Sequence, residues 1–246
     1  MEKRHAGRGV VISGGTSGIG LACARRLHDE GARVWVLGTS EETVASGLAQ
    51  LPDGVRGSVC DVSDEQAVEA TVAEAAAAFG RLDVAVCNAG IDGQGVNALD
   101  LDVHTLRRVL DVNVVGVFLL ARACARLMAP GSAIVVNASV NALRPEGGFL
   151  DYNVSKAGAA MVTRSLALDL AGRGISVSAI LPGYVPTRMT EPYLHDETIR
   201  ADVLEGIPFG RLGTPEEVAG LVAYLASAEA AYMTGALVTI DGGRSA

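Results

Sequence analysis

The chain has 246 residues, 49% of them hydrophobic, with a formal net charge of -8 and a sequence pI near 5.0. An acidic chain without a run of basic residues offers no electrostatic surface for nucleic acid or for an anionic membrane, so we expect neither as a partner. The longest charge-free apolar stretches are too short to cross a bilayer, and the charged N-terminus does not resemble a secretion signal. We therefore expect a cytoplasmic protein.

Short β-branched runs alternate with longer stretches of helical period along the chain. The runs predict strands over residues 10–12, 33–37, 57–60, 84–86, 133–136, 175–180 and 237–240. The longer stretches predict helices over residues 18–30, 63–79, 103–128, 152–171 and 215–226. Because the strands are mostly apolar on both faces, helices must cover both sides of a parallel sheet. We therefore expect a doubly wound α/β fold, with residues 1–246 in a single domain.

Residues 182–213 are the one long region without a clear strand or helix pattern, and they contain several prolines. Long irregular segments in compact domains are usually lids or binding loops. We therefore expect a substrate lid at about residues 184–209.

The cysteines and histidines are scattered along the chain. Neither set has the spacing of a metal site, and the cysteines all fall in apolar strand or helix patterns. We expect reduced, structural cysteines and no bound metal.

A glycine-rich turn follows the first predicted strand. Residues 13–20 read Ser-Gly-Gly-Thr-Ser-Gly-Ile-Gly and open a helix, which is the arrangement that lets backbone N–H groups approach a pyrophosphate. Asp61 ends the third predicted strand, and Asn88, Ala89 and Gly90 end the fourth. Because parallel sheets bind ligands at the carboxyl ends of their strands, these residues predict one Rossmann-like, dinucleotide-binding crevice.

Tyr152 and Lys156 stand four residues apart in a predicted helix, with Ser139 upstream. Residues at this spacing lie on the same helix face, so the ammonium can approach the phenol and favour its ionised form. Lys156 is one of only two lysines among the 20 basic residues. A compact ammonium on a flexible stem is not interchangeable with a guanidinium. The pattern therefore predicts a phenol whose pKa is lowered for proton transfer.

These motifs resemble the short-chain dehydrogenases/reductases of the single-domain type, and the likeness covers essentially the whole chain. The family's T-G-x-x-x-G-I-G has Ser13 in place of threonine, and its N-N-A-G has Cys87 in place of the first asparagine. Asn113, the Ser139, Tyr152, Lys156 set and the Pro182-Gly183 to Thr187 segment match the remaining motifs.

The resemblance implies an enzyme that interconverts a ketone and a secondary alcohol by hydride transfer. Tyr152 would be the general acid/base, Ser139 would bind the substrate oxygen, Lys156 would lower the Tyr152 pKa and hold the nicotinamide ribose, and Asn113 would position a water that relays protons. The implied coenzyme-binding residues are Gly14, Thr16, Ser17, Ile19, Thr39, Ser40, Asp61, Val62, Asn88, Ala89, Gly90, Tyr152, Lys156, Pro182, Gly183, Val185 and Thr187.

The choice of coenzyme depends on the end of the second strand. NAD enzymes of the family usually carry a carboxylate there for the ribose 2′-hydroxyl, whereas this chain has Gly38, followed by Thr39 and Ser40. Arginine, which NADP enzymes often use at position 39 or 17, is missing too. Hydroxyls and backbone amides could hold a 2′-phosphate, so we expect NADP, with NAD as the alternative.

A moderately sized hydroxylated or cyclic ketone suits the mixture of residues expected near the site. Candidates for contact with substrate are Asn141, Phe149, Tyr184, Met189 and Tyr193, with Asp92 and Gln94 near the mouth. Family resemblance also implies a homotetramer that pairs long helices, consistent with small or apolar residues on several sides of the helix from Tyr152.

Other functions stay open within and outside this class. A 3-oxoacyl-carrier-protein reductase belongs to the same family. A catalytically silent nucleotide-binding regulator is the alternative from a different class, although it would have no use for a phenol whose pKa is tuned. An epimerase or dehydratase of the related type generally has a further C-terminal substrate domain.

Overall fold

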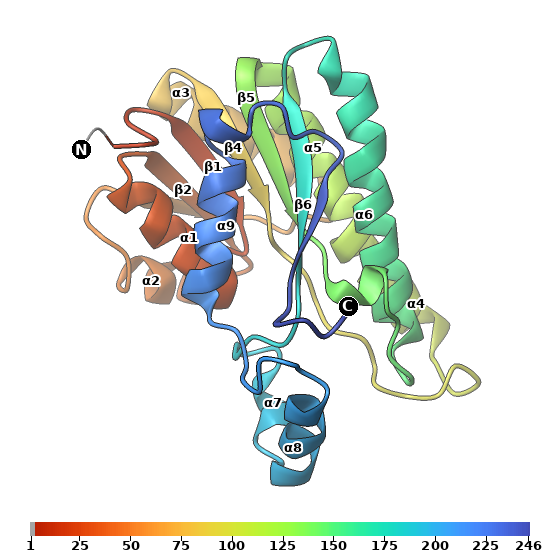
Figure 1. The fold of residues 1–246 in the computed structure, drawn as a ribbon. Coiled ribbons are helices and arrows are strands. Elements are labelled where there is room, and N and C mark those ends of the chain that lie inside the picture. The colour runs from red at the N-terminus through yellow and green to blue at the C-terminus, as the bar shows by residue number, and fades with distance from the viewer. Residues whose placement is uncertain (1–2) are drawn as a thin grey trace.

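Seven parallel strands form one sheet in the computed structural model, which describes residues 3–246 (Figure 1). The strands are β1 (Gly9–Ser13), β2 (Arg33–Gly38), β3 (Arg56–Val59), β4 (Leu82–Cys87), β5 (Met128–Asn137), β6 (Ser176–Pro182) and β7 (Leu237–Ile240). Their order is β3-β2-β1-β4-β5-β6-β7, so the chain winds outward in both directions from β1 and β4. This order confirms the doubly wound α/β fold and leaves a crevice at the reversal point, beyond the strand ends.

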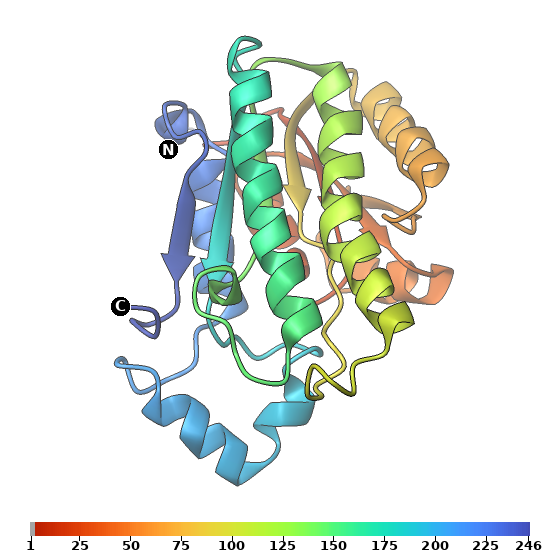
Figure 2. The same ribbon diagram turned by 90° about the vertical axis from the view of Figure 1, so that its right-hand side faces the viewer.

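Helices cover both faces of the sheet. On one face lie α1 (Gly18–Asp29) and α9 (Pro215–Leu225), and on the other lie α3 (Glu65–Phe79), α5 (Gly116–Leu127) and α6 (Leu150–Ala171) (Figure 2). The central strands alternate between these two layers, as the pleat requires. In β1, Val11 packs in the α3–α5–α6 layer, whereas Val10 and Ile12 pack in the α1–α9 layer, and all three are fully buried. The burial of both faces of the strand agrees with the expectation that the strands are apolar on both faces.

Two helical regions differ from the sequence-based expectation. The predicted helix over 103–128 is divided into α4 (Val103–Leu110), a π-helical turn η1 (Asp111–Val115) and α5, and Met128 already begins β5. Helix α2 (Glu41–Leu48) was not predicted, because its eight residues include Thr, Val, Ser and Gly, which are weak helix formers. A capping box between Ser40 and Thr43 stabilises its first turn.

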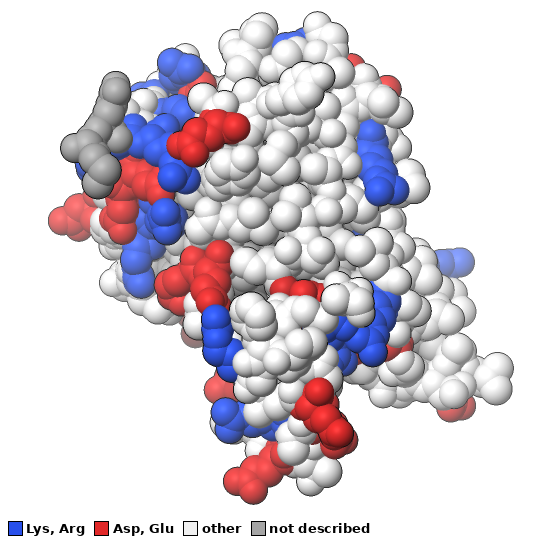
Figure 3. Space-filling view, viewed as in Figure 1, with Lys and Arg blue, Asp and Glu red and all other residues white. Residues whose placement is uncertain are grey.

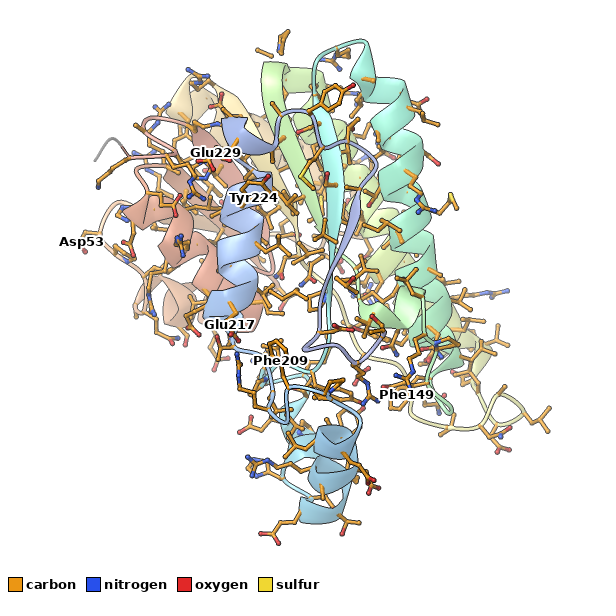
Figure 4. The ribbon with its side chains drawn as sticks, in the orientation of Figure 1. Asp53, Phe149, Phe209, Glu217, Tyr224 and Glu229 are labelled. Atoms are coloured by element: carbon orange, nitrogen blue, oxygen red, sulfur yellow. The ribbon has the colours of Figure 1, made fainter. Side chains whose placement is uncertain are left out.

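The expected irregular region contains two short helices, α7 (Glu191–Leu194) and α8 (Glu197–Glu205), which lie below the strand ends in Figure 1. The Asp196 side chain caps α8 by accepting hydrogen bonds from the backbone N–H groups of Thr198 and Ile199. No residue of α7 is buried, and Val203 is the buried residue of α8. Phe209, 72% exposed, lies between these helices and the sheet (Figure 4), where its N–H donates to the Gly242 carbonyl.

The surface is charged unevenly. In the view of Figure 3, acidic and basic side chains gather over α1 and around α7 and α8, and few lie over β7 and the upper part of α6. None of the helices in the described part of the chain is long and apolar enough to span a bilayer.

Candidate active site

A cavity of about 510 Å³ lies at the carboxyl ends of the strands, within the size range of ligand pockets. It brings together most of the residues that the sequence assigned to the coenzyme, together with Ser139 and the lid residue Met189. Those coenzyme residues are Gly14, Thr16, Ser17, Ile19, Thr39, Asp61, Val62, Asn88, Ala89, Gly90, Tyr152, Lys156, Pro182, Gly183, Val185 and Thr187.

Six predicted site residues do not line this cavity. Ser40 serves as the cap of α2. Asn141 donates its amide to Asn153, and the Tyr184 hydroxyl donates to Glu146. Phe149 and Tyr193 contact each other edge to face, with ring centroids 5.9 Å apart. The six predicted site residues outside the cavity lining are Ser40, Asn113, Asn141, Phe149, Tyr184 and Tyr193.

The glycine-rich turn is shaped by close backbone contacts. Gly14 has φ 60°, a conformation that favours glycine, and a Cβ on Gly20 would collide with the Gly14 carbonyl oxygen. The Ser13 hydroxyl accepts hydrogen bonds from the N–H groups of Asn88 and Ala89, each 3.0 Å, and so joins β1 to the end of β4. A glycine-rich turn that opens α1 fits a pyrophosphate, so the residues present fit a dinucleotide.

A carboxylate with an adjacent cation borders the cavity at the end of β3. Asp61 accepts hydrogen bonds from the Ser63 hydroxyl at 2.6 Å and from Arg108 at 3.2 Å. The Ser63 hydrogen bond is the main cause that lowers the Asp61 pKa, and the Arg108 charge adds to it. At the end of β2, by contrast, the wall is formed by Gly38, Thr39 and Thr43.

Ser139, Tyr152 and Lys156 meet beside the end of β5. Ser139 follows the last residue of β5 by two positions and is 7% exposed. Its hydroxyl donates to the Asn141 side-chain oxygen over a long distance of 3.3 Å. Lys156 is 5% exposed, and its Nζ lies 5.5 Å from the Tyr152 ring centroid and donates to the Asn137 carbonyl at 2.9 Å. The spacing of Tyr152 and Lys156 on α6 therefore does place the ammonium beside the phenol.

The electrostatics of this pair differ from the expectation. Burial raises the pKa of the Tyr152 phenol, and the nearby Ser139 side chain opposes that shift only in part. Burial also lowers the pKa of Lys156 to about 8, opposed by the charge of Asp92. Desolvation therefore dominates the Tyr152 pKa in this structure, and a lowering of that pKa by Lys156 stays a prediction. At neutral pH the phenol is held in its protonated form.

Asn113 lies inside the protein, 1% exposed, in the π-helical turn η1. Its side chain accepts from the Ile91 N–H at 2.8 Å, donates to the Ile91 carbonyl at 2.9 Å and donates to the Ser155 hydroxyl at 2.9 Å. A Cβ on Gly90 would lie 3.3 Å from the Asn113 Oδ1 and 3.4 Å from the Lys156 Nζ. Asn113 thus fixes the loop after β4 beside Lys156. Its neighbour Val112 lines the cavity, whereas Asn113 itself does not.

Several cavity residues were not predicted as coenzyme or catalytic residues. Asn137, whose carbonyl holds Lys156, could have been found as a polar residue at the end of a predicted strand. Arg188 directly follows the Thr187 of a recognised motif, and Arg108 precedes Asn113 by a little over one helical turn, but neither position carried a signal of its own. Within residues 3–246, no cluster of three or more His, Cys, Asp or Glu side chains could hold a metal ion.

Comparison with known proteins identifies the family. A family model described as enoyl-(acyl carrier protein) reductase matches residues 14–245. The chain is 39% identical to cis-4-hydroxycyclohexanecarboxylate dehydrogenase of Sinomonas cyclohexanicum over the full length of both chains. It is 36% identical to the 3-oxoacyl-[acyl-carrier-protein] reductase MabA of Mycobacterium avium, covering 96% of this chain and 89% of the relative. The crystal structure of levodione reductase superposes with a TM-score of 0.92 and 36% identity, covering 98% of each chain.

This chain belongs to the short-chain dehydrogenase/reductase family. It is an oxidoreductase that interconverts a ketone and a secondary alcohol, with a nicotinamide dinucleotide as coenzyme.

Proposed function

We propose that this enzyme is an NADP(H)-dependent oxidoreductase of hydroxylated or cyclic ketones of moderate size, with Tyr152 as its general acid/base. The observation that carries the proposal is that Tyr152, Ser139 and Lys156 line the same cavity as the glycine-rich turn. A phenol, a hydroxyl and an ammonium at one end of a dinucleotide-sized crevice are what carbonyl reduction requires of a protein.

The coenzyme supplies or accepts the hydride, and the chain's own residues handle the substrate oxygen and its proton. The Ser139 hydroxyl exchanges its long contact with Asn141 for a hydrogen bond to the substrate oxygen. Tyr152, protonated at neutral pH because burial raises its pKa, donates the proton to that oxygen during ketone reduction. Lys156 would orient the nicotinamide ribose from its anchor on Asn137, and Asn113 would act on the proton relay by holding the loop after β4 through Ile91.

The preference for NADP rests on the wall formed by Gly38, Thr39 and Thr43. This part of the cavity presents hydroxyls and backbone, and it lacks a carboxylate that would repel a 2′-phosphate. Asp61, which lines the cavity at the end of the neighbouring strand β3, is paired with Arg108. The remaining coenzyme residues would hold the pyrophosphate and the adenosine half.

We also propose a homotetramer located in the cytoplasm. Val154, Met161 and Leu168 are large apolar residues seven apart on α6, exposed by 48%, 57% and 81%, and Phe118 on the neighbouring α5 is exposed by 38%. An apolar stripe of this kind on two adjacent helices fits a second copy of the chain. Gly158 on α6 faces Val114 of the same chain, whose Cγ2 would lie 3.0 Å from a Cβ at this position.

The test is turnover of a panel of cyclic ketones, polyols and acetoacetyl-coenzyme A, followed at the nicotinamide absorbance with both coenzymes. Acetoacetyl-coenzyme A turned over best would favour the 3-oxoacyl-carrier-protein reductase, the activity named for the Mycobacterium avium relative. Tyr152→Phe removes one oxygen and should lower kcat by a factor of about 10² to 10⁴ while coenzyme binding persists. Tyr232→Phe, at a fully exposed tyrosine, is the matched control. Tyr152→Phe with kcat within threefold of wild type would contradict the assignment of the acid.

A further inference from the structure

Asp92 places an ionisable carboxylate in the wall of the active cavity. It follows β4 by a few residues and lines the same cavity as Ser139, Tyr152 and Met189. Its negative charge is felt at both proton-transfer groups, because it raises the pKa of Tyr152 and opposes the lowering of the Lys156 pKa. Asp92 therefore shares the cavity with the groups that are expected to bind the substrate oxygen.

The carboxylate of Asp92 is only partly satisfied by the protein. Its Oδ1 accepts from the Gly93 N–H at 2.9 Å, and its Oδ2 accepts from the Tyr193 hydroxyl at 2.7 Å. Among residues 3–246 no Arg, Lys or His nitrogen lies within the 4.0 Å of an ion pair with it. Since an ionised carboxylate offers about four lone-pair sites, two remain for hydrogen-bond donors from outside the protein.

The neighbouring polar side chains are already engaged elsewhere. The Gln94 side-chain oxygen accepts from the Asp102 N–H at 3.1 Å, away from the cavity lining. The Asn141 amide is held by Asn153, and the Glu146 carboxylate by Tyr184 and Arg244. Of Asp92, Gln94, Asn141 and Glu146, Asp92 is the one that lines the cavity.

We propose that Asp92 selects substrates that carry a second hydroxyl, by accepting a hydrogen bond from it while Ser139 and Tyr152 bind the reacting oxygen. This inference rests on the proposed function and names its substrate class as diols and hydroxyketones. An ionised carboxylate can only accept, so the substrate must bring the donor. Hydrogen bonds to charged acceptors are roughly twice as strong as neutral ones.

The same carboxylate disfavours an anionic substituent on the substrate. A second carboxylate in a partly desolvated cavity meets like-charge repulsion, and selectivity of this kind works by rejecting the wrong partner. The relative from Sinomonas cyclohexanicum is named for a substrate with such a carboxylate. This chain, by our inference, prefers the neutral diol over that anionic substrate.

The experiment compares kcat/KM for cyclohexanol, trans-cyclohexane-1,2-diol and cis-4-hydroxycyclohexanecarboxylate in the wild type and in Asp92→Asn. We expect the wild type to favour the diol over cyclohexanol by at least tenfold, and Asp92→Asn to reduce that ratio at least tenfold. We expect the ratio of carboxylate to cyclohexanol to rise in the same variant. Asp100→Asn, at an exposed aspartate outside the cavity lining, is the matched control and should leave both ratios unchanged.

A purely structural role for Asp92 is tested with Tyr193→Phe, which removes the hydroxyl bound to Asp92 but leaves its charge in place. We expect the diol preference to persist in Tyr193→Phe. If Tyr193→Phe and Asp92→Asn lose the preference equally, Asp92 acts only by holding α7, and the proposal fails. A wild type that favours the carboxylate, with the ratio unchanged by Asp92→Asn, would assign charge selection to Arg188, which lines the same cavity.

Failure of this inference is distinguishable from failure of the proposed function. Turnover of cyclohexanol and the diol at equal kcat/KM would overturn the role of Asp92 and leave a ketone and alcohol oxidoreductase. Turnover of none of the three compounds, with either coenzyme, would overturn the proposed substrate class and the role of Asp92 with it. Thermal denaturation of each variant identifies any loss of activity that is due to unfolding.

Discussion

Gly38 at the end of β2 offers the most direct test of coenzyme choice. From the sequence, Gly38→Asp is expected to shift the preference from NADP(H) to NAD(H), because a carboxylate would face the 2′-phosphate. The structure adds a steric term. A Cβ at this position would lie 2.9 Å from Cγ2 of both Thr16 and Val44 and 3.1 Å from the Thr43 hydroxyl. These are β-branched side chains with little freedom to move.

Two magnitudes follow from this geometry. Overpacking of a close-packed site costs about 1 to 3 kcal/mol, which for a chain of this length lowers the Tm by about 2 to 12 °C. The electrostatic effect is a swing in coenzyme preference of at least tenfold, or about 1.4 kcal/mol. Gly38→Ala carries the same Cβ without the charge, so it separates the two effects.

The assay is kcat/KM for NADP(H) and for NAD(H) in the wild type, Gly38→Ala and Gly38→Asp, with the Tm of each. We expect both variants to lose stability and only Gly38→Asp to shift the ratio tenfold relative to Gly38→Ala. Thr39→Asp, at a position that already has a Cβ and lines the cavity, should shift the ratio in the same direction with less loss of stability. A wild type that already uses NAD(H) tenfold better, or equal ratios in Gly38→Ala and Gly38→Asp, would refute the reasoning.

Three further predictions concern Lys156, the assembly and the lid. With a pKa lowered to about 8, Lys156 loses its proton as the pH rises through 8, so kcat/KM for ketone reduction should fall above that pH. Lys156→Arg keeps the charge, but a guanidinium does not fit the buried position beside the Asn137 carbonyl. The variant should therefore lower kcat/KM by a factor of about 100 and remove the decline at high pH. An unchanged rate and pH profile would show that Lys156 takes no part in the reaction. Light scattering at micromolar concentration should give the mass of a tetramer, and Met161→Glu on the exposed stripe of α6 should reduce it, whereas a monomeric wild type would contradict the assembly. Hydrogen exchange should be fast in α7 and α8, which bury little apolar surface, and protection equal to that of β4 would contradict a mobile lid.

The sign of the Lys156 shift also predicts a dependence of stability on pH. A folded-state pKa near 8, below the usual value of about 10.4, means that the unfolded chain binds more protons than the folded one between these pH values. The contribution of Lys156 to the free energy of unfolding therefore rises with pH in this window. This effect is opposite in direction to the expected decline in reduction activity.

The sequence by itself determined the strands, the glycine-rich turn and the pairing of Tyr152 with Lys156. These features depend on residues close together in the chain: a short β-branched run in a strand, a strand-to-helix turn, and two residues four apart on one helix. Ser13 illustrates the same point, since its hydroxyl holds the N–H groups at the end of β4 although the family has threonine at this position. The doubly wound fold class followed as well, because helices that alternate with parallel strands leave few topologies.

The tertiary structure decided the ionisation of Tyr152, the environment of Asn113 and which lid residues reach the cavity. The protein around the phenol desolvates it, and the spacing of residues along α6 cannot show that this desolvation raises the Tyr152 pKa. Asn113 meets Ile91 and Ser155 across the chain, and Tyr193 meets Asp92 instead of the cavity. Each outcome depends on how closely elements distant in the chain approach one another and on how much water they exclude. Those quantities are set by packing over the whole fold, whereas the sequence pattern records only what neighbours along the chain can do.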